Sequence, residues 1–588
     1  MNLKRLSQIS HYKFIRFFSN RNLPEDYYLY FLAALVGVLA GFGAVALTKM
    51  VHLFQTLFFG ELLSVVSQNG ILYYIVKIGI PAIGGLLVGL VIYFFSRESA
   101  GHGVPGVIEA ISDKEGIIKP KVSIITILTS GTLIGTGGSA GKEGPIIQIG
   151  AALGSAVGQF FRVSANRLKI LVGAGAGAGL AAVFNAPVTG VLFVLEVLLR
   201  DFSINAFSPI IVATVIATTI SHYFIGSTPL YEVPSYHLND PREYFFYAVI
   251  GILGGLLSVF FIKFFYKFED VFEQLKRVPS YLKPAIGGLI VGVLALKFPQ
   301  IYGWDDSGIH SAITQQNSVL FLLVIFMVKM IATSSSLGSG GTGGLFTPSL
   351  FLGATFGAAM GVLLNKLFPG VPAHPGAYAL VGMGIMIAGT THAALSAMIL
   401  IFEITRDYAI ILPLMLGIMT ATIASRKFEM ENIYTFKLSL KNELYLRGRR
   451  KDILEQIYVT SIIRKEFEQI LVNERLKEIW NKVKHGTFDT FPVVDKQGHL
   501  KGLLTFKDIK HALFEDALDE LVIAADIVNE NAFYISEMAT AYDALNIFDI
   551  TDYDILPVVS SRQNKKLVGI VCKKDIEKLY REKYLEKL

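Results

Sequence analysis

Apolar runs of membrane-spanning length recur from Tyr28 to Ser425, and they restrict the fold more than any other feature of the chain. A helix needs about 20 consecutive apolar residues to cross the hydrocarbon core of a bilayer. Runs of this kind include FLAALVGVLAGFGAVAL, IVKIGIPAIGGLLVGLVIYFF and FYAVIGILGGLLSVFFIKFF. Only 17% of the 588 residues are charged, whereas soluble domains carry roughly a quarter. The sequence therefore predicts an all-α, multi-pass domain embedded in a lipid bilayer.

The composition changes after Arg426, where charged residues become dense and apolar segments become short. This tail repeats itself, because FDTFPVVDKQGHLKGLLTFKDIKHAL begins at Phe488 and YDILPVVSSRQNKKLVGIVCKKDIEKLY begins at Tyr553. Each copy predicts a strand ending in Pro-Val-Val, a polar turn, a second strand and a helix opened by Lys-Asp-Ile. We expect a soluble α+β part built from two copies of one unit.

Basic residues mark both ends of the apolar region. Residues 1–27 interleave basic and aromatic side chains and lack the compact apolar core of a signal peptide. This pattern predicts an amphipathic segment at the cytoplasmic membrane face. Because the tail is also basic, we place both termini in the cytoplasm and the protein in a plasma (inner) membrane. The net charge of +6 reflects this bias and indicates no nucleic-acid partner, and the single cysteine, Cys572, excludes a disulfide within the chain.

A glycine-rich stretch inside the apolar region, GTGGSAGKEGPIIQIG from Gly135, has some features of a phosphate-binding loop. The P-loop pattern requires glycine at the position of Thr136 and serine or threonine at that of Glu143. Both requirements fail, and the sequence has neither a metal-ligand cluster nor a nucleophile–base pattern. We therefore predict no enzyme activity, no metal and no required cofactor.

Three glycine-rich turns lead into a proline within apolar surroundings, at Pro105, Pro145 and Pro348. Proline suits the first turn of a helix, where its missing N–H costs nothing. A helix that starts inside a membrane exposes up to four unpaired N–H groups at that turn, and such groups favour a bound anion. Two of the turns lie in similar segments of the two halves of the chain, which indicates an inverted repeat with a site in the middle of the membrane.

These motifs resemble those of the CLC family of chloride channels and transporters. GHGVP (101–105), GKEGP (141–145) and GGLFTP (343–348) are similar to the three anion-pathway motifs of that family, and VFNAPVTGVLFVLEV (183–197) is similar to its central Asn-Ala-Pro helix. The resemblance covers residues 28–445. It implies broken, tilted helices in two inverted halves, with one ion pathway in each subunit of a homodimer.

The resemblance also assigns roles to single residues. Glu143 would be the gating glutamate, whose carboxylate occupies an anion site until protonation frees that site. Tyr434 in ENIYTF matches the tyrosine that offers its hydroxyl to the central anion. The anion-binding residues implied in this way are His102, Gly103, Lys142, Gly144, Leu345, Phe346, Thr347 and Tyr434.

Two positions depart from the family pattern. His102 stands where the family has serine, or proline in some nitrate carriers. It would donate an N–H to the anion, titrate near neutral pH as a charge-dependent filter, or act as a bulky inner gate without direct ligation. Val197 replaces the glutamate that relays protons in proton-coupled members. Glu196 is its neighbour, but one residue turns about 100° around a helix, so Glu196 faces elsewhere and has an interface or capping role.

The two tail units resemble CBS modules, which pair and often bind adenine nucleotides. We assign residues 446–515 to the linker and first module, and residues 516–588 to the second. Thr505 and Asp508 match a pair that contacts phosphate and ribose in that family. The second copy keeps Asp575 but has Cys572 in place of the hydroxyl residue. Binding of ATP, ADP or AMP and a purely structural, dimerising role both remain open at this point.

We expect this chain to transport chloride or another small anion through a glutamate-gated pathway. Val197 favours channel-like or weakly proton-coupled conduction, and an H⁺/Cl⁻ antiporter is the alternative. A CBS-regulated cation transporter is a remote alternative, because a hard cation needs clustered carboxylates and these helix starts present N–H donors.

Overall fold

The structure is a computed structural model that describes residues 25–66, 70–95, 103–226, 240–314, 317–440, 454–455, 457–485, 488–506, 508–509, 522–529, 532–551, 553–561 and 565–585. The chain divides into two compact units, Met1–Leu444 and Tyr445–Leu588. Most of the predicted amphipathic segment 1–27 and the whole of His102 lie outside the described residues.

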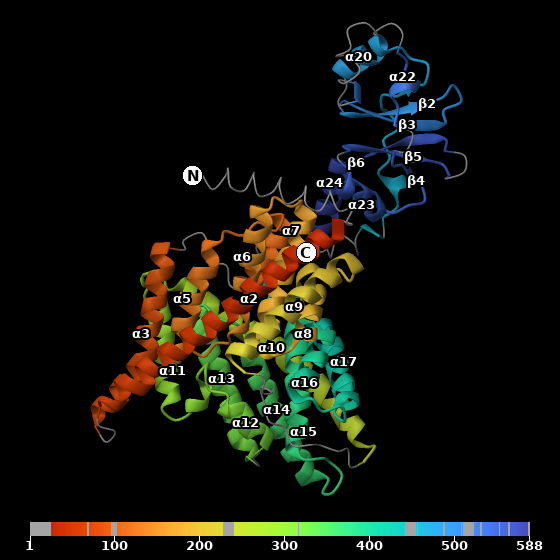
Figure 1. Cartoon of the computed structure of the whole chain (residues 1–588). Helices are drawn as coiled ribbons and strands as arrows, with labels where there is room; N and C mark the ends of the chain where they lie inside the picture. The colour runs from red at the N-terminus through yellow and green to blue at the C-terminus, as the bar shows by residue number, and fades with distance from the viewer. Residues whose placement is uncertain are drawn as a thin grey trace. The chain divides into compact units, whose positions relative to one another are not determined.

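The first unit is built from helices (Figure 1). Its first half contains α2 (Glu25–Gln55), η1 (Thr56–Leu62), α3 (Ile71–Phe95), α4 (Val104–Asp113), α5 (Lys121–Gly135), α6 (Glu143–Phe160), α7 (Ala165–Phe184), α8 (Pro187–Phe193), η2 (Val194–Leu199) and α9 (Ile204–Phe224). Its second half contains α10 (Glu243–Gln274), α11 (Lys283–Ala295), η3 (Pro299–Ile301), α12 (Ser307–Thr314), α13 (Val319–Gly338), α14 (Phe346–Leu367), α15 (Pro375–Thr391), α16 (Ala394–Thr405), α17 (Ile411–Phe428) and α18 (Phe436–Leu440).

Eight helical stretches within the described residues are long and apolar enough to cross a membrane. Large apolar side chains are also exposed on the outside of the first unit, among them Ile75, Ile204, Phe245 and Ile423. Exposed apolar surface on this scale is suited to contact with lipid. The helices therefore support the predicted multi-pass domain.

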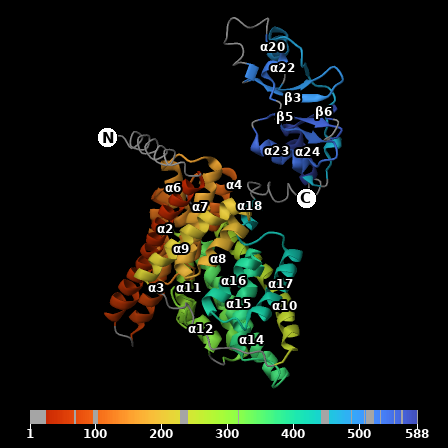
Figure 2. The same ribbon diagram turned by 45° about the vertical axis from the view of Figure 1, so that its right-hand side comes forward.

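The two halves repeat one arrangement of helices. α6 packs on α7 as α14 packs on α15, and both pairs lie side by side in two views (Figure 1, Figure 2). α7 is followed by Asn185 and α15 by His392, and both residues have a left-handed backbone at φ 57°. Two residues later, a short helix begins in each half, α8 or α16. The order and packing of these elements agree with the repeat inferred from the glycine-rich motifs.

Small residues make this packing close. A Cβ atom added to Gly150 of α6 would lie 2.0 Å from the carbonyl oxygen of Gly175 in α7, and one on Gly353 of α14 would lie 2.3 Å from that of Gly382 in α15. Because any larger residue would separate these helices, the glycines allow α6 to pack closely on α7 and α14 to pack closely on α15.

The second unit contains two three-stranded sheets with the same topology. In each sheet the middle strand pairs in parallel with the first and antiparallel with the third, with a register shift at the second valine of the Pro-Val-Val motif. The strands are β1 (Ile470–Leu471), β2 (Thr490–Val494), β3 (Leu500–Thr505), β4 (Ile535–Ser536), β5 (Ile555–Val559) and β6 (Leu567–Cys572). The helical elements are η4 (Val459–Ser461), α20 (Leu476–His485), α22 (Ala524–Ile527), α23 (Ala541–Ile550) and α24 (Lys573–Leu585).

The sheets therefore confirm the predicted tandem α+β repeat.

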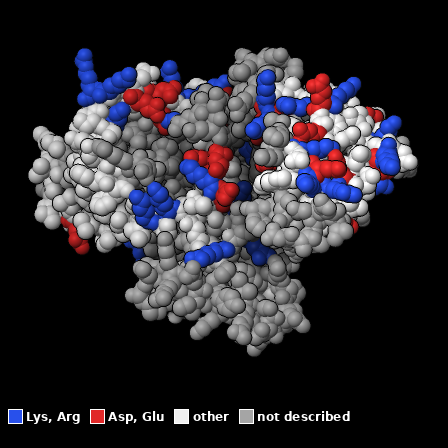
Figure 3. Space-filling model, turned by 90° about the horizontal axis from the view of Figure 1, so that it is seen from above, with Lys and Arg blue, Asp and Glu red and all other residues white. Residues whose placement is uncertain are grey.

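Lys and Arg side chains are interspersed with Asp and Glu over the described part of the face drawn in Figure 3.

Candidate functional site

The two glycine-rich loops meet through a pair of backbone hydrogen bonds. Gly141 donates its N–H to the carbonyl oxygen of Gly344 at 2.9 Å, and Gly344 donates to that of Gly141 at 2.8 Å. α6 begins two residues after Gly141, and α14 begins two residues after Gly344. This contact therefore brings the starts of two helices from opposite halves of the chain to one place.

The start of α4 joins them through glycine contacts. A Cβ on Gly144 would lie 2.9 Å from the Cα of Gly344, and one on Gly103 would lie 3.2 Å from the carbonyl carbon of Gly144. Gly103 also has a φ of 60°, which side-chain-bearing residues rarely adopt. The first turns of α4, α6 and α14 therefore converge, as the three proline-containing motifs predicted.

Glu143 is the first residue of α6, and its side chain lies against the first turn of α14. One carboxylate oxygen accepts a short hydrogen bond from the Thr347 hydroxyl, and the other accepts one from the Thr347 N–H at 3.3 Å. Glu143 is only 3% exposed. A buried carboxylate needs such partners, and the partial positive charge of the helix start adds to them.

Gly141 makes room for this carboxylate. A Cβ atom at Gly141 would lie 1.9 Å from Oε2 of Glu143, and one at Gly344 would lie 3.2 Å from the same oxygen. The carboxylate therefore rests on the two glycines that join the loops.

A cavity of about 140 Å³ adjoins these helix starts. It is lined by Gly103, Val104, Pro105, Gly106, Glu109, Ser130, Gly144, Pro145, Gln148, Phe265, Tyr266, Glu269, Leu337, Gly341, Thr342, Gly343, Gly344, Leu345, Ile433, Tyr434, Lys437 and Leu438. Of the residues inferred from the sequence, the structure brings Gly103, Gly144, Leu345 and Tyr434 together around it.

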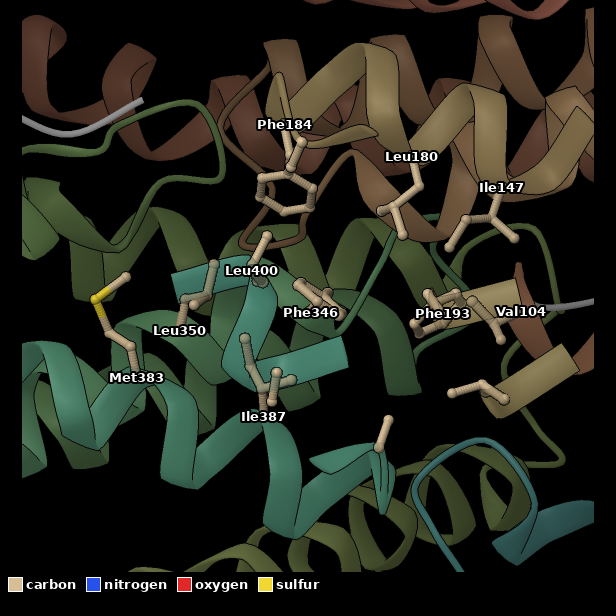
Figure 4. Close-up of a cluster of buried hydrophobic side chains, with 14 of the residues drawn as sticks. Val104, Ile147, Leu180, Phe184, Phe193, Phe346, Leu350, Met383, Ile387 and Leu400 are labelled. Atoms are coloured by element: carbon tan, nitrogen blue, oxygen red, sulfur yellow. The ribbon is translucent and has the colours of Figure 1, made fainter. Parts of the chain in front are cut away.

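Aromatic side chains connect the remaining site residues to Tyr434. Phe346 is buried between Phe184 and Phe193, with ring centroids 5.4 and 6.1 Å away (Figure 4). The Phe193 and Tyr434 rings are nearly perpendicular, with their centroids 6.3 Å apart. Glu143, Phe346 and Thr347 thus lie beside the cavity wall. Lys142 precedes Glu143, is half-buried and does not line the cavity.

Val197 lies in η2 and is 4% exposed within the apolar core. Its neighbour Glu196 points to the start of α16, where it accepts hydrogen bonds from the N–H groups of Leu395 and Ser396. The structure therefore gives Glu196 a capping role.

Seven polar residues of the cavity wall were not among those inferred from the sequence. They are Glu109, Gln148, Tyr266, Ser130 on α5, Glu269 on α10, Thr342 in the second glycine-rich loop and Lys437 on α18. Thr342 lies next to GGLFTP, and Lys437 follows Tyr434 by about one helical turn, so these two positions carried a local signal. Ser130 and Glu269 had none, because they belong to helices outside the motifs.

The two halves of the tail differ at the positions predicted to bind nucleotide. The Thr505 hydroxyl donates to Asp508 at 2.7 Å, and the Asp508 N–H donates back at 3.3 Å, which is a helix-capping arrangement. Asp575 instead accepts two hydrogen bonds from Arg464, at 2.5 and 2.7 Å.

Charge also distinguishes the predicted nucleotide-binding positions in the second unit of the tail. The hydrogen-bonded Arg464 guanidinium holds the pKa of Asp575 below its usual value. Burial raises the pKa of the Cys572 thiol to about 11, so this thiol is neutral near pH 7. The described residues hold no group of His, Cys, Asp or Glu side chains suited to a metal ion.

Comparisons with known proteins agree with this architecture. A family model described as "Voltage gated chloride channel" matches residues 84–426, and a CBS domain model matches residues 459–515 and 524–582. The chain is 30% identical over 420 residues to a putative chloride channel protein ClcB-like from Ralstonia nicotianae, which covers 71% of this chain and 98% of that protein.

It is also 30% identical over 416 residues to an H⁺/Cl⁻ exchange transporter ClcA from Salmonella schwarzengrund, covering 69% of this chain and 87% of that protein. The crystal structure of a slow cyanobacterial Cl⁻/H⁺ antiporter matches with a TM-score of 0.65 and 27% identity, over 70% of this chain and 97% of that one. These matches confirm the expected fold class, a helical membrane domain followed by two small α/β modules.

Proposed function

This chain belongs to the CLC family of chloride channels and transporters, and on that premise we propose that it conducts chloride passively along a pathway gated by Glu143. It is an integral, multi-pass membrane protein of an anion-transporting family whose members are channels or transporters. The observation that carries the proposal is the Glu143 carboxylate bound at the start of α14, beside a cavity lined by Tyr434.

The proposed gate follows from the charge of this contact. An ionised Glu143 occupies the N–H and hydroxyl donors of Thr347 as an anion does. Protonation removes the negative charge and weakens both hydrogen bonds, because the donors then face a neutral group. The side chain is then free to leave the start of α14, and a chloride ion takes its place beside Phe346 and Tyr434.

The test is chloride flux through purified full-length protein in liposomes, measured from acidic to neutral pH. Wild-type flux is expected to rise as the pH falls, and Glu143→Ala is expected to remain fast at every pH. A Glu143→Ala variant that keeps the wild-type pH dependence would falsify the gating role.

A second candidate is H⁺/Cl⁻ exchange. It is favoured by the similarity to an exchange transporter and to a solved antiporter. The observation against it is Val197, which has no titratable group where proton-coupled members carry the relay glutamate. A chloride gradient applied across the same liposomes separates the two, because uphill proton movement supports exchange and its absence supports passive conduction.

We further propose a homodimer in a plasma (inner) membrane with both termini in the cytoplasm. In this assignment residues 28–445 form the transport domain, 446–515 the linker and first CBS module, and 516–588 the second. Cross-linking in intact cells, with antibody access to a tag at each terminus, tests the assembly and the orientation.

An adenine nucleotide at the tail is proposed as a regulator and not as a required cofactor. Thr505 and Asp508 would contact its phosphate and ribose, while Asp575 is already held by Arg464. Titration of ATP, ADP and AMP into the full chain by calorimetry tests this proposal. The absence of binding heat for all three nucleotides would indicate that the tail has only a structural role.

A further inference from the structure

We propose that the side-chain hydroxyls of Ser130 and Thr342 bind the permeating anion at a second position in the cavity. The inference rests on the proposed anion conduction and extends it to two residues outside the motifs. Both residues line the cavity that also touches Gly103, Gly144 and Tyr434. The hydroxyl oxygens of both are buried and have no hydrogen-bond partner in the described part of the chain.

Ser130 is unusual among the hydroxyl residues of its own helix. Serine and threonine in helices commonly donate to the carbonyl oxygen four residues earlier. Thr129 donates to Ile125 at 2.8 Å and Thr132 donates to Leu128 at 2.7 Å in this way. Ser130 is 0% exposed, lies between them on α5 and makes no such bond. Its hydroxyl proton therefore has no acceptor among the described residues, and Ser130 lines the cavity.

Thr342 reaches the same space from the opposite half of the chain. It lies in the glycine-rich loop before α14, next to Gly341 and Gly343, which also line the cavity. A Cβ on Gly341 would lie 2.9 Å from a methyl carbon of Leu133, so this loop packs against the helix that carries Ser130. The two hydroxyls therefore come from elements that touch each other.

A buried hydroxyl without a partner costs free energy, so such groups in native proteins call for an explanation. A small anion would supply the missing hydrogen-bond partner, because each hydroxyl then donates to the ion. The N–H groups at the starts of α4, α6 and α14 add positive potential. Lys437 also lines the cavity, and its ammonium lies 2.5 Å from Glu269 and 2.6 Å from Glu273. Because the single Lys437 ammonium is already paired with two carboxylates, the hydroxyls provide the close, neutral donors.

The chain also offers a matched control. Ser334 and Ser335 on α13 are buried and have hydroxyls without a partner, as Ser130 does, but they do not line the cavity. Ser335→Ala therefore removes the same atom from a similar environment away from the proposed site.

The experiment measures chloride flux against chloride concentration for the full-length protein in liposomes. Ser130→Ala and Thr342→Val are each expected to raise the apparent KM for chloride about three- to tenfold, the size of one modest hydrogen bond. The double variant is expected to raise it further and to change the ratio of chloride to nitrate flux. Ser335→Ala is expected to stay within about twofold of wild type.

Crystals of the unmodified protein soaked in bromide provide a second measurement that needs no variant. An anomalous peak within hydrogen-bond distance of both hydroxyls supports the site. An ordered water there without anomalous signal overturns it, as does an unchanged KM in the double variant. If the wild-type protein passes no chloride at all, the proposed function fails, whereas normal flux with an unaltered KM in the double variant refutes only this inference.

Discussion

Glu196 and Glu403 hold equivalent positions in the two halves of the repeat, and each carboxylate caps the short helix of the other half. Glu196 accepts from the Ser396 N–H at 2.8 Å and from its hydroxyl at 2.6 Å. Glu403 accepts from the Thr189 N–H and hydroxyl at the same two distances. These bonds tie α8 and α16 together, and they satisfy N–H groups that a helix start would otherwise leave unpaired.

The reciprocal caps predict a loss of stability when either carboxylate is neutralised. Glu196→Gln and Glu403→Gln are each expected to lower the free energy of unfolding by about 1 to 3 kcal/mol, because a charged acceptor of three hydrogen bonds is lost. The measurement is thermal unfolding of the purified protein, with the exposed Glu61→Gln as control. A proton-coupled flux that disappears in Glu196→Gln without loss of stability would show that Glu196 relays protons.

Thr347→Val is predicted to open the Glu143 gate. The substitution removes the hydroxyl that donates to the ionised carboxylate, so the charged, bound form loses part of its stabilisation. We expect the midpoint of the pH dependence of chloride flux to move to higher pH. Thr355→Val is the matched control on α14, since the Thr355 hydroxyl donates only to carbonyl oxygens of its own helix. An unshifted midpoint in Thr347→Val would contradict the proposed contact.

Gly141→Ala is predicted to displace the Glu143 side chain. The added methyl group would lie 1.9 Å from the carboxylate oxygen, well inside van der Waals contact. We therefore expect a flux that depends weakly on pH, as for Glu143→Ala. Gly79→Ala on α3 is the control, because a Cβ there meets nothing within 4 Å. A Gly141→Ala variant with wild-type pH dependence would mean that the carboxylate does not rest on this loop.

The Arg464–Asp575 ion pair predicts a small pH-dependent stabilisation of the tail. The folded pKa of Asp575 lies below its usual value, so the contribution is complete above the unfolded pKa of about 3.9 and is lost as the pH falls through the folded pKa. Because the Asp575 side chain is 25% exposed, Arg464→Met is expected to cost only about 0.5 kcal/mol at neutral pH.

The measurement is the thermal transition reported by Trp480 in full-length Trp304→Phe protein. The difference between Arg464→Met and wild type should shrink on acidification below the unfolded pKa. Lys573→Met, which removes a looser pair with Asp549 at 3.8 Å, should leave the transition unchanged. A constant difference at every pH would assign the effect of Arg464 to packing.

Features encoded by neighbouring residues were predictable from the chain alone. The apolar runs predicted the membrane domain, and Pro105, Pro145 and Pro348 predicted helix starts that the structure places in the first turns of α4, α6 and α14. The repeated Pro-Val-Val and Lys-Asp-Ile segments predicted the two sheets of the tail. Each of these signals lies within about one element, where local propensity and hydrophobic periodicity act.

Contacts between distant segments could be identified only from the tertiary structure. The bonds between Gly141 and Gly344, the capping of α16 by Glu196 and the shared cavity of Ser130 and Thr342 each join residues about 200 positions apart. Residue type and spacing do not predict such pairings, because the pairings form only when the two halves of the repeat pack against each other. The helix starts were therefore visible in the sequence, and the groups that face them were a product of tertiary packing.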